Sequence, residues 1–509
     1  MRYVIGIDKG TSVIKAVVFD AAGRTCGQGQ RRVDVLRPHP GWHEEDPDTT
    51  WSLCTTAIRD AIAAAGIAPS AIKGIGIAAH MGGAWVLDAH GKHLRNAICW
   101  PDARAQPEQM ALEQAGTLPQ VFAISGNGLM PGITVMLLAW LTRHEPAIVA
   151  KAKVVLCAKD YLRFRLTGAI ATDPSDVSFV PGDIDARRHS PEVLRLCGAG
   201  AWLDKLPPIL ESGDVAGGIT EAAAAETGLA VGTPVIVGLG DASANALGVG
   251  CVRPGQSVTV LGTSCLNSRV MAGPERAPEG LGFLFAMPFA RYLRILPNTS
   301  GTITMDWFLD RFGGPKRADG TWDFAALEAR AKAVPRGAGG VVMLPYVNGS
   351  GVLAPFFDAQ ARSVFFGQGS HTTREHLLRA VYEALCFSTR DCFEDMTGQA
   401  TSLILTGGGS RSPFWAQMFA DVCGLPIDVP EAQESGALGV ALLAGAATGL
   451  WPDLETAVAQ TARTAARYEP DPVAQAEYDG WFSLYRATRD VYRRHSAARA
   501  ELATAGGAA

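Results

Sequence analysis

Short runs of Val and Ile residues separated by turns open the chain. Residues 2–8 and 13–20 flank the turn-like tetrapeptide 9–12, and a further run follows at about 25–35. Runs of this length between turn residues are typical of strands. The pattern therefore predicts an antiparallel meander at the start of a domain, which differs from the strand–helix–strand opening of a dinucleotide-binding fold.

The next segment has helical spacing. Asp46-Pro47 provides a helix start, because proline is favoured in the first turn. Apolar residues then recur on one face, and Gly66 is placed to end the helix. That face consists of Trp51, Cys54, Ile58 and Ile62. Strand and helix patterns continue to alternate along most of the chain, which indicates an α/β architecture.

A second copy of this opening is expected in the middle of the chain. Residues 257–261 have the pattern of a strand, followed by Gly262-Thr263-Ser264 and a second run that ends at Met271. Gly10-Thr11-Ser12 occupies the equivalent turn in the first meander. We therefore predict two domains of one type.

The boundary between the two domains is expected in the small-residue stretch 246–254. Residues 1–248 would then form the first domain and residues 249–509 the second. The segment 472–503 has the pattern of a long helix with aromatic residues on one side, and we interpret it as a packing element.

The composition fits a folded chain of two domains. Of 509 residues, 48% are hydrophobic and 19% are charged, so large cores can be buried and global disorder is excluded. The net charge of −5 gives no reason to expect a nucleic-acid or membrane partner. The longest apolar run, Ala437 to Ala447, is shorter than the ~18 residues that span a bilayer. Because the chain enters a strand at once, we expect no signal peptide and a cytoplasmic protein.

The first candidate for chemistry is the segment from Asp8 to Ser12, with Lys15 nearby. A phosphate chain needs backbone N–H groups that are free to point toward it, which favours glycine in a tight turn, and neighbouring hydroxyls add hydrogen bonds. An aspartate at a strand end can also hold Mg²⁺ through water. A plain β-hairpin turn explains the same residues equally well.

The second candidate is Asp241, which follows the apolar strand 235–237 and two glycines and precedes a small-residue helix. It can be a simple N-cap of that helix. A carboxylate at the end of a buried strand also suits a group that receives a substrate proton. We expect it to stay ionised, because a helix N-terminus favours negative charge.

The third candidate is the run of three glycines at 407–409, between a strand at 403–405 and a helix that begins with Ser412-Pro413. Consecutive glycines let a flat ligand such as a nucleotide lie against the backbone, which favours a nucleotide site over a structural loop. The run matches neither the P-loop nor the Rossmann glycine motif.

Together these three loops resemble the FGGY carbohydrate kinases, which belong to the hexokinase/Hsp70/actin superfamily. The resemblance extends from Ile5 to beyond Gly445. It implies an α/β fold of two ribonuclease-H-like (actin/hexokinase/Hsp70-type) domains with an active-site cleft between the lobes. It also implies ATP and Mg²⁺ as cofactors, Asp241 as the catalytic base, and Asp8 with Asp241 around the metal.

The resemblance also assigns the contacts to the nucleotide. Its two phosphate loops correspond to Gly10, Thr11, Ser12 and Lys15, and to Gly262, Thr263 and Ser264. Its adenosine signature corresponds to Gly407, Gly408, Gly409 and Ser410.

Sugar contacts are expected from two segments of the first domain, in addition to Asp241. His80-Met81 follows a strand at 75–78, where xylulokinase-like members place sugar-binding residues, although a satisfied histidine at a strand end is an equal alternative. Asp102 lies in Trp100-Pro101-Asp102-Ala103-Arg104, which is similar to the Trp-x-Asp-x-Arg segment whose aspartate binds sugar hydroxyls in the family.

Three residues depart from common patterns of the family: Lys9, Leu137 and Ala242. They indicate a chain closer to the L-xylulose, ketogulonate and erythritol kinases than to glycerol kinases, with a pocket for a four- or five-carbon substrate. We expect an ATP-dependent kinase for a hydroxyl of a ketose or polyol, with a pentulose such as xylulose as the first choice. An erythritol or other sugar-alcohol kinase is one alternative, and a nucleotide-gated binding protein of the actin or Hsp70 sort is another. The expected partner is a small sugar or polyol, and a homodimer is left open.

Overall fold

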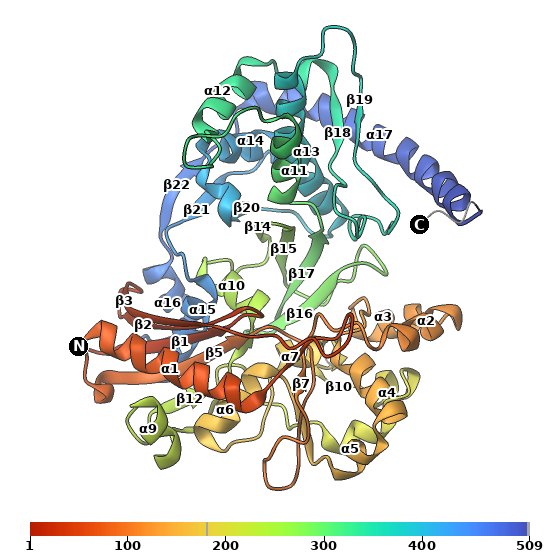
Figure 1. Cartoon of the computed structure of the whole chain (residues 1–509). Coiled ribbons are helices and arrows are strands. Elements are labelled where there is room, and N and C mark those ends of the chain that lie inside the picture. The colour runs from red at the N-terminus through yellow and green to blue at the C-terminus, as the bar shows by residue number, and fades with distance from the viewer. Residues whose placement is uncertain (180–181, 506–509) are drawn as a thin grey trace.

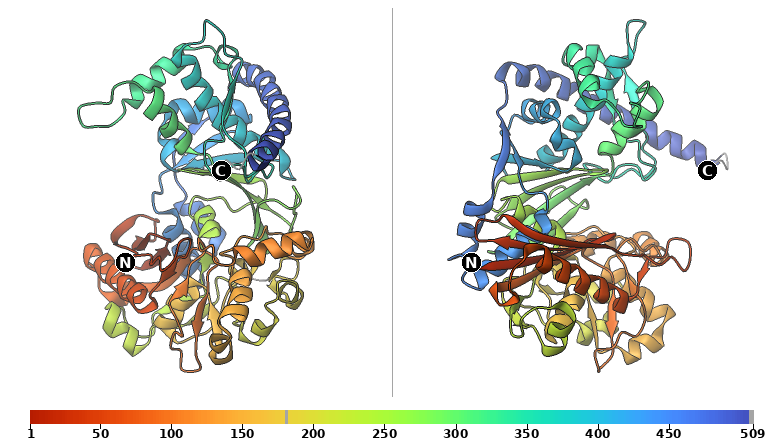
Figure 2. Two further views of the ribbon diagram at one scale, coloured as in Figure 1. Left: turned by 45° about the vertical axis from the view of Figure 1, so that its right-hand side comes forward. Right: turned by 60° about the vertical axis from the view of Figure 1, so that its left-hand side comes forward.

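The computed structural model describes residues 1–179 and 182–505, which form two lobes, one above the other in Figure 1. Each lobe is built around a seven-stranded mixed sheet with helices packed against it. The two lobes are joined at a narrower waist, which Figure 2 shows from two further directions. The prediction of two α/β domains is confirmed.

The sheet of the lower lobe has the strand order β11-β12-β5-β1-β2-β3, with β13 also paired to β5. β1, β2 and β3 are antiparallel neighbours, whereas β5 and β12 continue the sheet in parallel. The strands are β1 (Tyr3–Lys9), β2 (Val13–Asp20), β3 (Thr25–Arg32), β5 (Ile72–Ala79), β11 (Val215–Gly218), β12 (Pro234–Ile236) and β13 (Leu239–Gly240).

The sheet of the upper lobe repeats this plan. Its order is β16-β17-β15-β14-β20-β21-β22, so β17-β15-β14-β20-β21 matches β3-β2-β1-β5-β12 in both order and direction. The second copy predicted from the glycine turns is therefore present. The strands are β14 (Gln256–Leu261), β15 (Cys265–Met271), β16 (Phe283–Met287), β17 (Arg291–Asn298), β20 (Ser402–Thr406), β21 (Ile427–Pro430) and β22 (Thr464–Tyr468).

Helix α1 (Pro47–Ala65) shows why the local sequence folds as predicted. The side chain of Asp46 accepts a hydrogen bond from the N–H of Thr49, and Pro47 occupies the first turn. Gly66 ends the helix with a left-handed φ of 62°, which glycine adopts without steric cost. The apolar face of the helix packs on Ile5, Ile7 and other strand residues of the lower core.

Helix α15 (Ser435–Ala447) lies in the lower lobe, although the preceding strand β21 belongs to the upper sheet (Figure 1). A Cβ atom at Gly6 would lie 1.8 Å from the carbonyl oxygen of Ala437, and one at Gly76 would lie 2.2 Å from that of Val440. Glycine in β1 and β5 is therefore required for this close packing. Because α15 and α16 (Leu454–Thr461) pack in the lower lobe, a division at residue 248/249 does not coincide with the packed bodies.

The remaining elements cover the two sheets. In the lower lobe they are α2 (Gln106–Gln114), α3 (Leu118–Ser125), α4 (Thr134–His144), α5 (Pro146–Lys151), α6 (Ala158–Thr167), α7 (Pro174–Phe179), α8 (Pro191–Leu196), α9 (Glu221–Thr227), α10 (Asp241–Gly248), and the short strands β4 (Glu44–Glu45), β6 (Trp85–Leu87), β7 (Ala97–Ile98), β8 (Val154–Leu156), β9 (Gly182–Asp183) and β10 (Arg188–His189). In the upper lobe they are α11 (Thr302–Phe312), α12 (Phe324–Ala333), α13 (Arg374–Asp395), α14 (Pro413–Cys423), α17 (Pro472–Ala505), β18 (Val342–Leu344) and β19 (Val364–Phe366).

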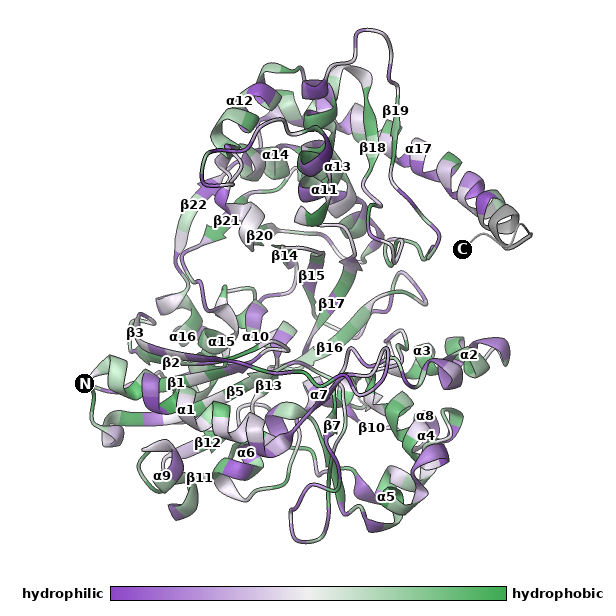
Figure 3. Ribbon diagram, viewed as in Figure 1, coloured by the Kyte–Doolittle hydropathy of each residue, from purple (hydrophilic) through white to green (hydrophobic). Residues whose placement is uncertain are grey.

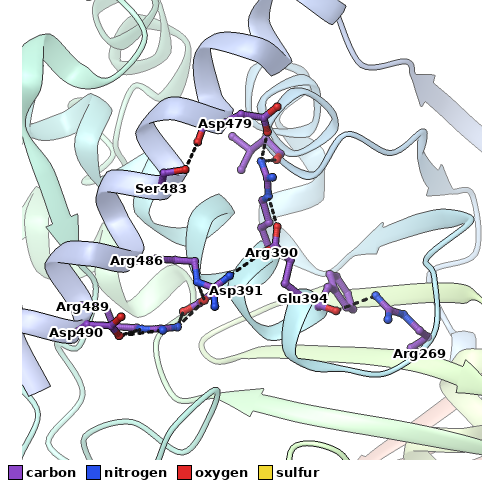
Figure 4. A network of polar contacts seen from close by, with 11 residues as sticks. Arg269, Arg390, Asp391, Glu394, Asp479, Ser483, Arg486, Arg489 and Asp490 are labelled. Atoms are coloured by element: carbon purple, nitrogen blue, oxygen red, sulfur yellow. Dashed lines mark hydrogen bonds and ion pairs between the residues drawn. The ribbon is translucent and has the colours of Figure 1, made fainter.

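The long C-terminal helix α17 is a packing element, as predicted. Hydrophobic and hydrophilic residues alternate along it in Figure 3, and Tyr478 and Tyr485 are buried in the upper core. Its polar side chains pair with α13: Arg489 Nη1 lies 2.5 Å from Asp391 Oδ2, and Arg390 Nη1 lies 2.6 Å from Asp479 Oδ1 (Figure 4). Within the described residues, no helix is both long and apolar enough to cross a membrane.

Candidate active site

Two aspartates lie on either side of the end of strand β5. Asp8 in β1 pairs with Ala78, and Asp241 directly follows Gly240, which pairs with Ala79. The two carboxylates therefore meet at one edge of the lower sheet, close enough for the charge of Asp8 to raise the pKa of Asp241. The structure brings together the two residues that the sequence suggested for a metal site.

Burial raises the pKa of both carboxyl groups. The pKa of Asp8 rises to about 6 because of burial, against the opposing charge of Lys15. The pKa of Asp241 rises to about 7 because of burial and the charge of Asp8, although the N–H of Ala242 donates to its Oδ1 at 2.7 Å. Burial and the charge of Asp8 thus act against the helix N-terminus, which the sequence predicts to keep Asp241 ionised. Asp241 is the first residue of α10, and Gly240 occupies the cap position.

The surroundings of this pair fit an oxygen-ligated divalent cation. Burial and mutual repulsion disfavour the two negative charges, and a cation between them would favour both ionised forms. Glycine at position 436 keeps the approach free, because a Cβ atom there would lie 2.5 Å from Asp8 Oδ2. Asn245 Oδ1 is near the same point and accepts a hydrogen bond from Ser435 Oγ at 2.6 Å.

The predicted first phosphate loop, Gly10-Thr11-Ser12, is the turn between β1 and β2. Its Thr11 Oγ1 accepts a hydrogen bond from Trp100 Nε1 at 2.9 Å, which links the loop to the predicted sugar segment. Lys15 pairs with Asp8 across the β1–β2 ladder, so it lies beside the carboxylate pair. Its Nζ is 2.7 Å from Glu434 Oε2, so the ammonium group is paired with a carboxylate in this structure, and its predicted contact with phosphate stays a prediction.

The predicted second phosphate loop (262–264) and the glycine loop (407–409) lie side by side at the ends of the parallel strands β14 and β20. Val260 pairs with Thr406, so residues 262–264 and 407–410 leave the sheet at the same edge. Gly407 has a φ of 89°, and a Cβ atom there would lie 2.6 Å from the carbonyl oxygen of Leu261. Thr263 and Ser264 are exposed. The two segments predicted for the nucleotide are therefore adjacent.

The glycines of this loop have different surroundings. A Cβ atom at Gly408 would meet no atom within 4 Å, whereas one at Gly409 would lie 2.3 Å from Leu261 Cδ2. Ser410 Oγ donates a hydrogen bond to the carbonyl oxygen of Gly407 at 2.8 Å. Gly408 thus faces free space, and Gly409 is required for packing. Ser412 caps α14 as predicted, with its Oγ 3.0 Å from the N–H of Trp415.

His80 and Met81 lie between the first phosphate loop and Asp241. A Cβ atom at Gly240 would lie 2.6 Å from Met81 Sδ, so Met81 packs directly beside the residue that precedes Asp241. The N–H of His80 donates to the carbonyl oxygen of Lys9 at 3.1 Å. The side chains of both residues are buried.

Lys9, which departs from the family pattern, forms a buried ion pair beneath His80. Its Nζ lies 2.7 Å from Glu45 Oε1 and 3.1 Å from His80 Nε2. An ammonium group can only donate, so Nε2 of neutral His80 accepts and its proton is on Nδ1, which has no partner among the described residues. Burial and the charge of Lys9 lower the pKa of His80. Burial acts to raise the pKa of Glu45, but the ammonium group of Lys9 outweighs burial and lowers that pKa.

Asp102 does not present its carboxylate to a ligand, and the expectation that it binds sugar hydroxyls needs correction. Its side chain is 0% exposed. Oδ1 accepts from the N–H and Nε of Arg104, each at 2.8 Å, and Oδ2 accepts from the N–H of His43 at 2.6 Å and from Arg104 Nη2 at 2.9 Å. With both oxygens occupied, Asp102 fixes the turn that carries Trp100, which is 37% exposed.

The substrate-size prediction also needs correction at one position. Leu137 is completely buried within α4 and contacts the core of the lower lobe, so it cannot line a pocket. Ala242 is half-buried and directly follows Asp241, which keeps it beside the site.

Sequence motifs missed several residues of this site. Glu45 pairs with Lys9, Asn245 lies beside Asp8, and Glu434 holds Lys15. Glu45 and Glu434 reach the site from distant parts of the chain and belong to no glycine motif. Asn245 lies one helical turn after Asp241, and this spacing is the one signal in the sequence for any of the three.

The match to known families covers both lobes. Residues 3–248 match the N-terminal domain of the FGGY family of carbohydrate kinases, and residues 258–448 match its C-terminal domain. The chain belongs to this family. The carbohydrate-kinase class predicted from the three loops is confirmed.

Relatives are similar over nearly their whole length. A probable L-xylulose kinase of Pasteurella multocida (strain Pm70) is 31% identical over 492 residues, covering 96% of this chain and 98% of that protein. The xylulose kinase of Escherichia coli (strain K12) is 35% identical over 449 residues, covering 86% and 89%. The crystal structure of a xyloylose kinase from Brucella ovis has a TM-score of 0.87 at 33% identity and covers 97% of this chain and 100% of that one.

Proposed function

We propose that this chain is an ATP-dependent kinase that phosphorylates a hydroxyl group of a small ketose or polyol. The observation that carries the proposal is the Asp8–Asp241 pair, which lies at the edge of the lower sheet that also carries the first phosphate loop and the buried His80-Met81 segment. A proton acceptor, a cation site and a polar pocket wall therefore share one edge of the lower sheet. Membership of the carbohydrate kinases supports this assignment.

Each part of the site then has a role in transfer. Asp241 orients the acceptor hydroxyl and takes its proton, which its raised pKa suits, because a base works best near the operating pH. Backbone and hydroxyl groups of the loops at Gly10 and Gly262 hold the phosphate chain, and Gly408 leaves room for the adenosine. The transition state of phosphoryl transfer is loose, so positioning and charge stabilisation supply most of the acceleration.

Asp8 and Asp241 are the residues that would hold Mg²⁺. When bound, Mg²⁺ neutralises charge on the phosphate oxygens. Lys15, paired with Glu434, contributes positive charge beside Asp8 without depending on the metal.

Among substrates, a pentulose is the first choice. The relatives above are named xylulose and L-xylulose kinases, and Ala242 leaves a small apolar surface beside Asp241. The pocket wall would consist of His80, Met81 and Trp100, with the His80 Nδ1–H free to donate to a substrate oxygen. Erythritol or another sugar alcohol is the alternative, since the same groups recognise any adjacent hydroxyls. The alternative of a nucleotide-gated binding protein gains no support from the family match.

A screen of acceptors tests the proposal. ADP release from MgATP is measured with D-xylulose, L-xylulose, erythritol, glycerol, glucose and gluconate at equal concentration. We expect strong stimulation by a pentulose or erythritol and little by glycerol or glucose. Stimulation by glycerol or a hexose alone would refute the substrate class, and the absence of stimulation by every acceptor would refute the kinase.

A further inference from the structure

A buried network of ions lies beneath Asp241 and takes no part in the proposed chemistry. At its centre, Lys159 Nζ on α6 lies 2.7 Å from Asp160 Oδ1, 2.9 Å from Asp173 Oδ1 and 2.8 Å from Asp176 Oδ2. All four side chains are at most 1% exposed. Burying four charges is expensive unless each is paired, so their arrangement calls for a function.

The ammonium group of Lys159 occupies the position that a bound cation would take among the surrounding carboxylates. Donor atoms of Cys157, Asp160 and Asp176 lie within 4.8 Å of one another, a spacing that could hold a metal ion. The ammonium group of Lys159 already contacts two of these three residues. It therefore supplies the positive charge that the carboxylates require, together with Arg163, whose Nη1 is 2.7 Å from Asp160 Oδ1.

The network forms hydrogen bonds with the segment that carries Asp241 at two points. Asp173 Oδ2 accepts a hydrogen bond from Ser175 Oγ at 2.7 Å, and Ser175 Oγ in turn accepts from the N–H of Gly240 at 2.9 Å. Arg163 Nη1 donates to the carbonyl oxygen of Val237 at 2.8 Å. The peptide groups on both sides of the turn 238–239 are thus bonded to the network.

Two contacts bring the turn still closer to Lys159 and Asp173. A Cβ atom at Gly238 would lie 3.5 Å from Lys159 Cδ, so the lysine stem packs under the turn. The N–H of Gly238 donates to the carbonyl oxygen of Ser212, whose Oγ donates to Asp173 Oδ2 at 2.7 Å. Ser175 and Ser212 thus both connect the turn to Asp173, and the carboxylate of Asp173 is paired with Lys159.

We propose that Lys159 is a positioning residue for catalysis. Its buried ammonium group holds Asp173 in place, and Asp173 fixes the position of Asp241 through Ser175 and the N–H of Gly240. The inference rests on the proposed role of Asp241 as base. Without the ammonium group, the three carboxylates repel one another, Asp173 shifts, and Ser175 no longer holds the Gly240 N–H. Displacement of a catalytic group by about 1 Å lowers turnover by about 10²-fold.

The test compares Lys159→Met with a matched loss of a buried ion pair elsewhere. Arg489→Met removes the cation from Asp391 (Figure 4), a pair between α17 and α13 in the upper lobe, whereas Asp241 lies in the lower lobe (Figure 1). We expect Lys159→Met to lower kcat by about 10²-fold with KM values for MgATP and D-xylulose within about twofold of wild type. Arg489→Met should lower Tm but leave kcat unchanged.

A readout independent of activity is hydrogen exchange of the peptide that spans residues 236–244. We expect exchange there to become faster in Lys159→Met and to stay unchanged in Arg489→Met. If Lys159→Met does not fold, Ser175→Ala decides the question, because it removes only the oxygen that holds the Gly240 N–H. Ser175→Ala should then show the same faster exchange together with a reduced kcat.

Wild-type exchange at 236–244 in folded Lys159→Met or Ser175→Ala, with wild-type kcat, would overturn the proposal. Loss of stability with wild-type kcat per folded molecule and wild-type values of both KM would assign Lys159 to folding alone. An inactive wild-type protein would refute the kinase function instead, and the exchange data would still decide whether Lys159 positions the turn.

Discussion

The two halves of the proposed site differ in the groups that line them: buried ionic side chains in one and glycine backbone in the other. On the lower side, where we propose that the sugar binds, the positioning groups would be buried ionic side chains: Lys9 with Glu45 and His80, and Lys159 with its three aspartates. On the upper side, where we propose that the nucleotide binds, Gly262 and Gly407–Gly409 would present backbone to the ligand. The two turns predicted to face the phosphates occupy equivalent positions in sheets of the same topology, but the polar groups around the two turns differ.

This difference has a physical reason. A nucleotide offers the same phosphates and flat base to every member of a kinase family, and backbone N–H groups beside glycine suffice to hold them. Sugars differ only in the placement of hydroxyls, and discrimination needs side chains whose donors and acceptors are fixed by buried partners. We therefore expect substitutions in the lower half to change acceptor use and those in the upper half to change ATP binding.

The largest expected effect is on turnover. Asp241→Ala removes the base from the lower half, and kcat should fall by about 10²–10⁴-fold while ATP affinity stays close to that of wild type. Steady-state kinetics and calorimetry measure the two quantities. Asp204→Ala, an exposed aspartate of the same lobe, is the matched control. Turnover near that of the control would remove Asp241 from the mechanism.

The next effect is on stability and sugar binding together. Lys9→Met leaves Glu45 buried without its cation, which should lower the free energy of unfolding by about 3–5 kcal/mol. Without Lys9 as donor to His80 Nε2, the ring proton of His80 is no longer fixed on Nδ1, the atom proposed to donate to the sugar. KM for the sugar should therefore rise more than KM for ATP. Denaturant unfolding and kinetics provide these values.

The double variant Lys9→Met/Glu45→Gln is the control, because it removes both charges. Its free energy of unfolding should return most of the way to that of wild type, whereas its KM for the sugar should stay raised. Equal increases in both KM values would show that the two halves are not separate in the way described above.

A smaller effect is expected in the upper half. A side chain at Gly408 enters free space, so Gly408→Val should fold normally and weaken ATP binding by roughly tenfold, equal to about 1.4 kcal/mol. Calorimetric titration with ATP measures this change. Gly480→Val on α17, where a Cβ atom also meets nothing, is the control. Unchanged ATP affinity in Gly408→Val would move the adenosine site elsewhere.

The smallest effect is expected where the halves of the substrate site meet. Trp100→Phe removes the hydrogen bond to Thr11 Oγ1, a loss of about 0.5–1.5 kcal/mol. Because this bond joins the sugar segment to the first phosphate loop, KM for sugar and KM for ATP should both rise a few-fold. Trp322→Phe in the upper lobe should change neither. A change in one KM alone would show that Trp100 serves only that ligand.

Much of this arrangement is predictable from local sequence. Turns and caps depend on neighbouring residues, so the sequence alone locates helix α1 with Asp46 and Gly66, and the turns at Gly10 and Gly262. The repeated meander follows from the same turns.

The features that local sequence does not predict depend on contacts between distant segments. The motif around Asp102 predicts a carboxylate that faces a sugar, but the N–H of His43 and the side chain of Arg104 occupy it. The pKa of Asp241 depends on burial and on Asp8, which is remote in sequence. The return of α15 to the lower lobe likewise follows from tertiary packing on glycines of β1 and β5, and no local pattern signals it.

The most direct test of the central claim is ³¹P NMR of wild type and Asp241→Ala with MgATP and the best acceptor of the screen. We expect wild type to convert ATP to ADP and an equal amount of a sugar phosphate monoester, and Asp241→Ala to form this product at least about 10²-fold more slowly. Release of inorganic phosphate at the same rate with and without the acceptor, or equal monoester formation by both proteins, would contradict this claim.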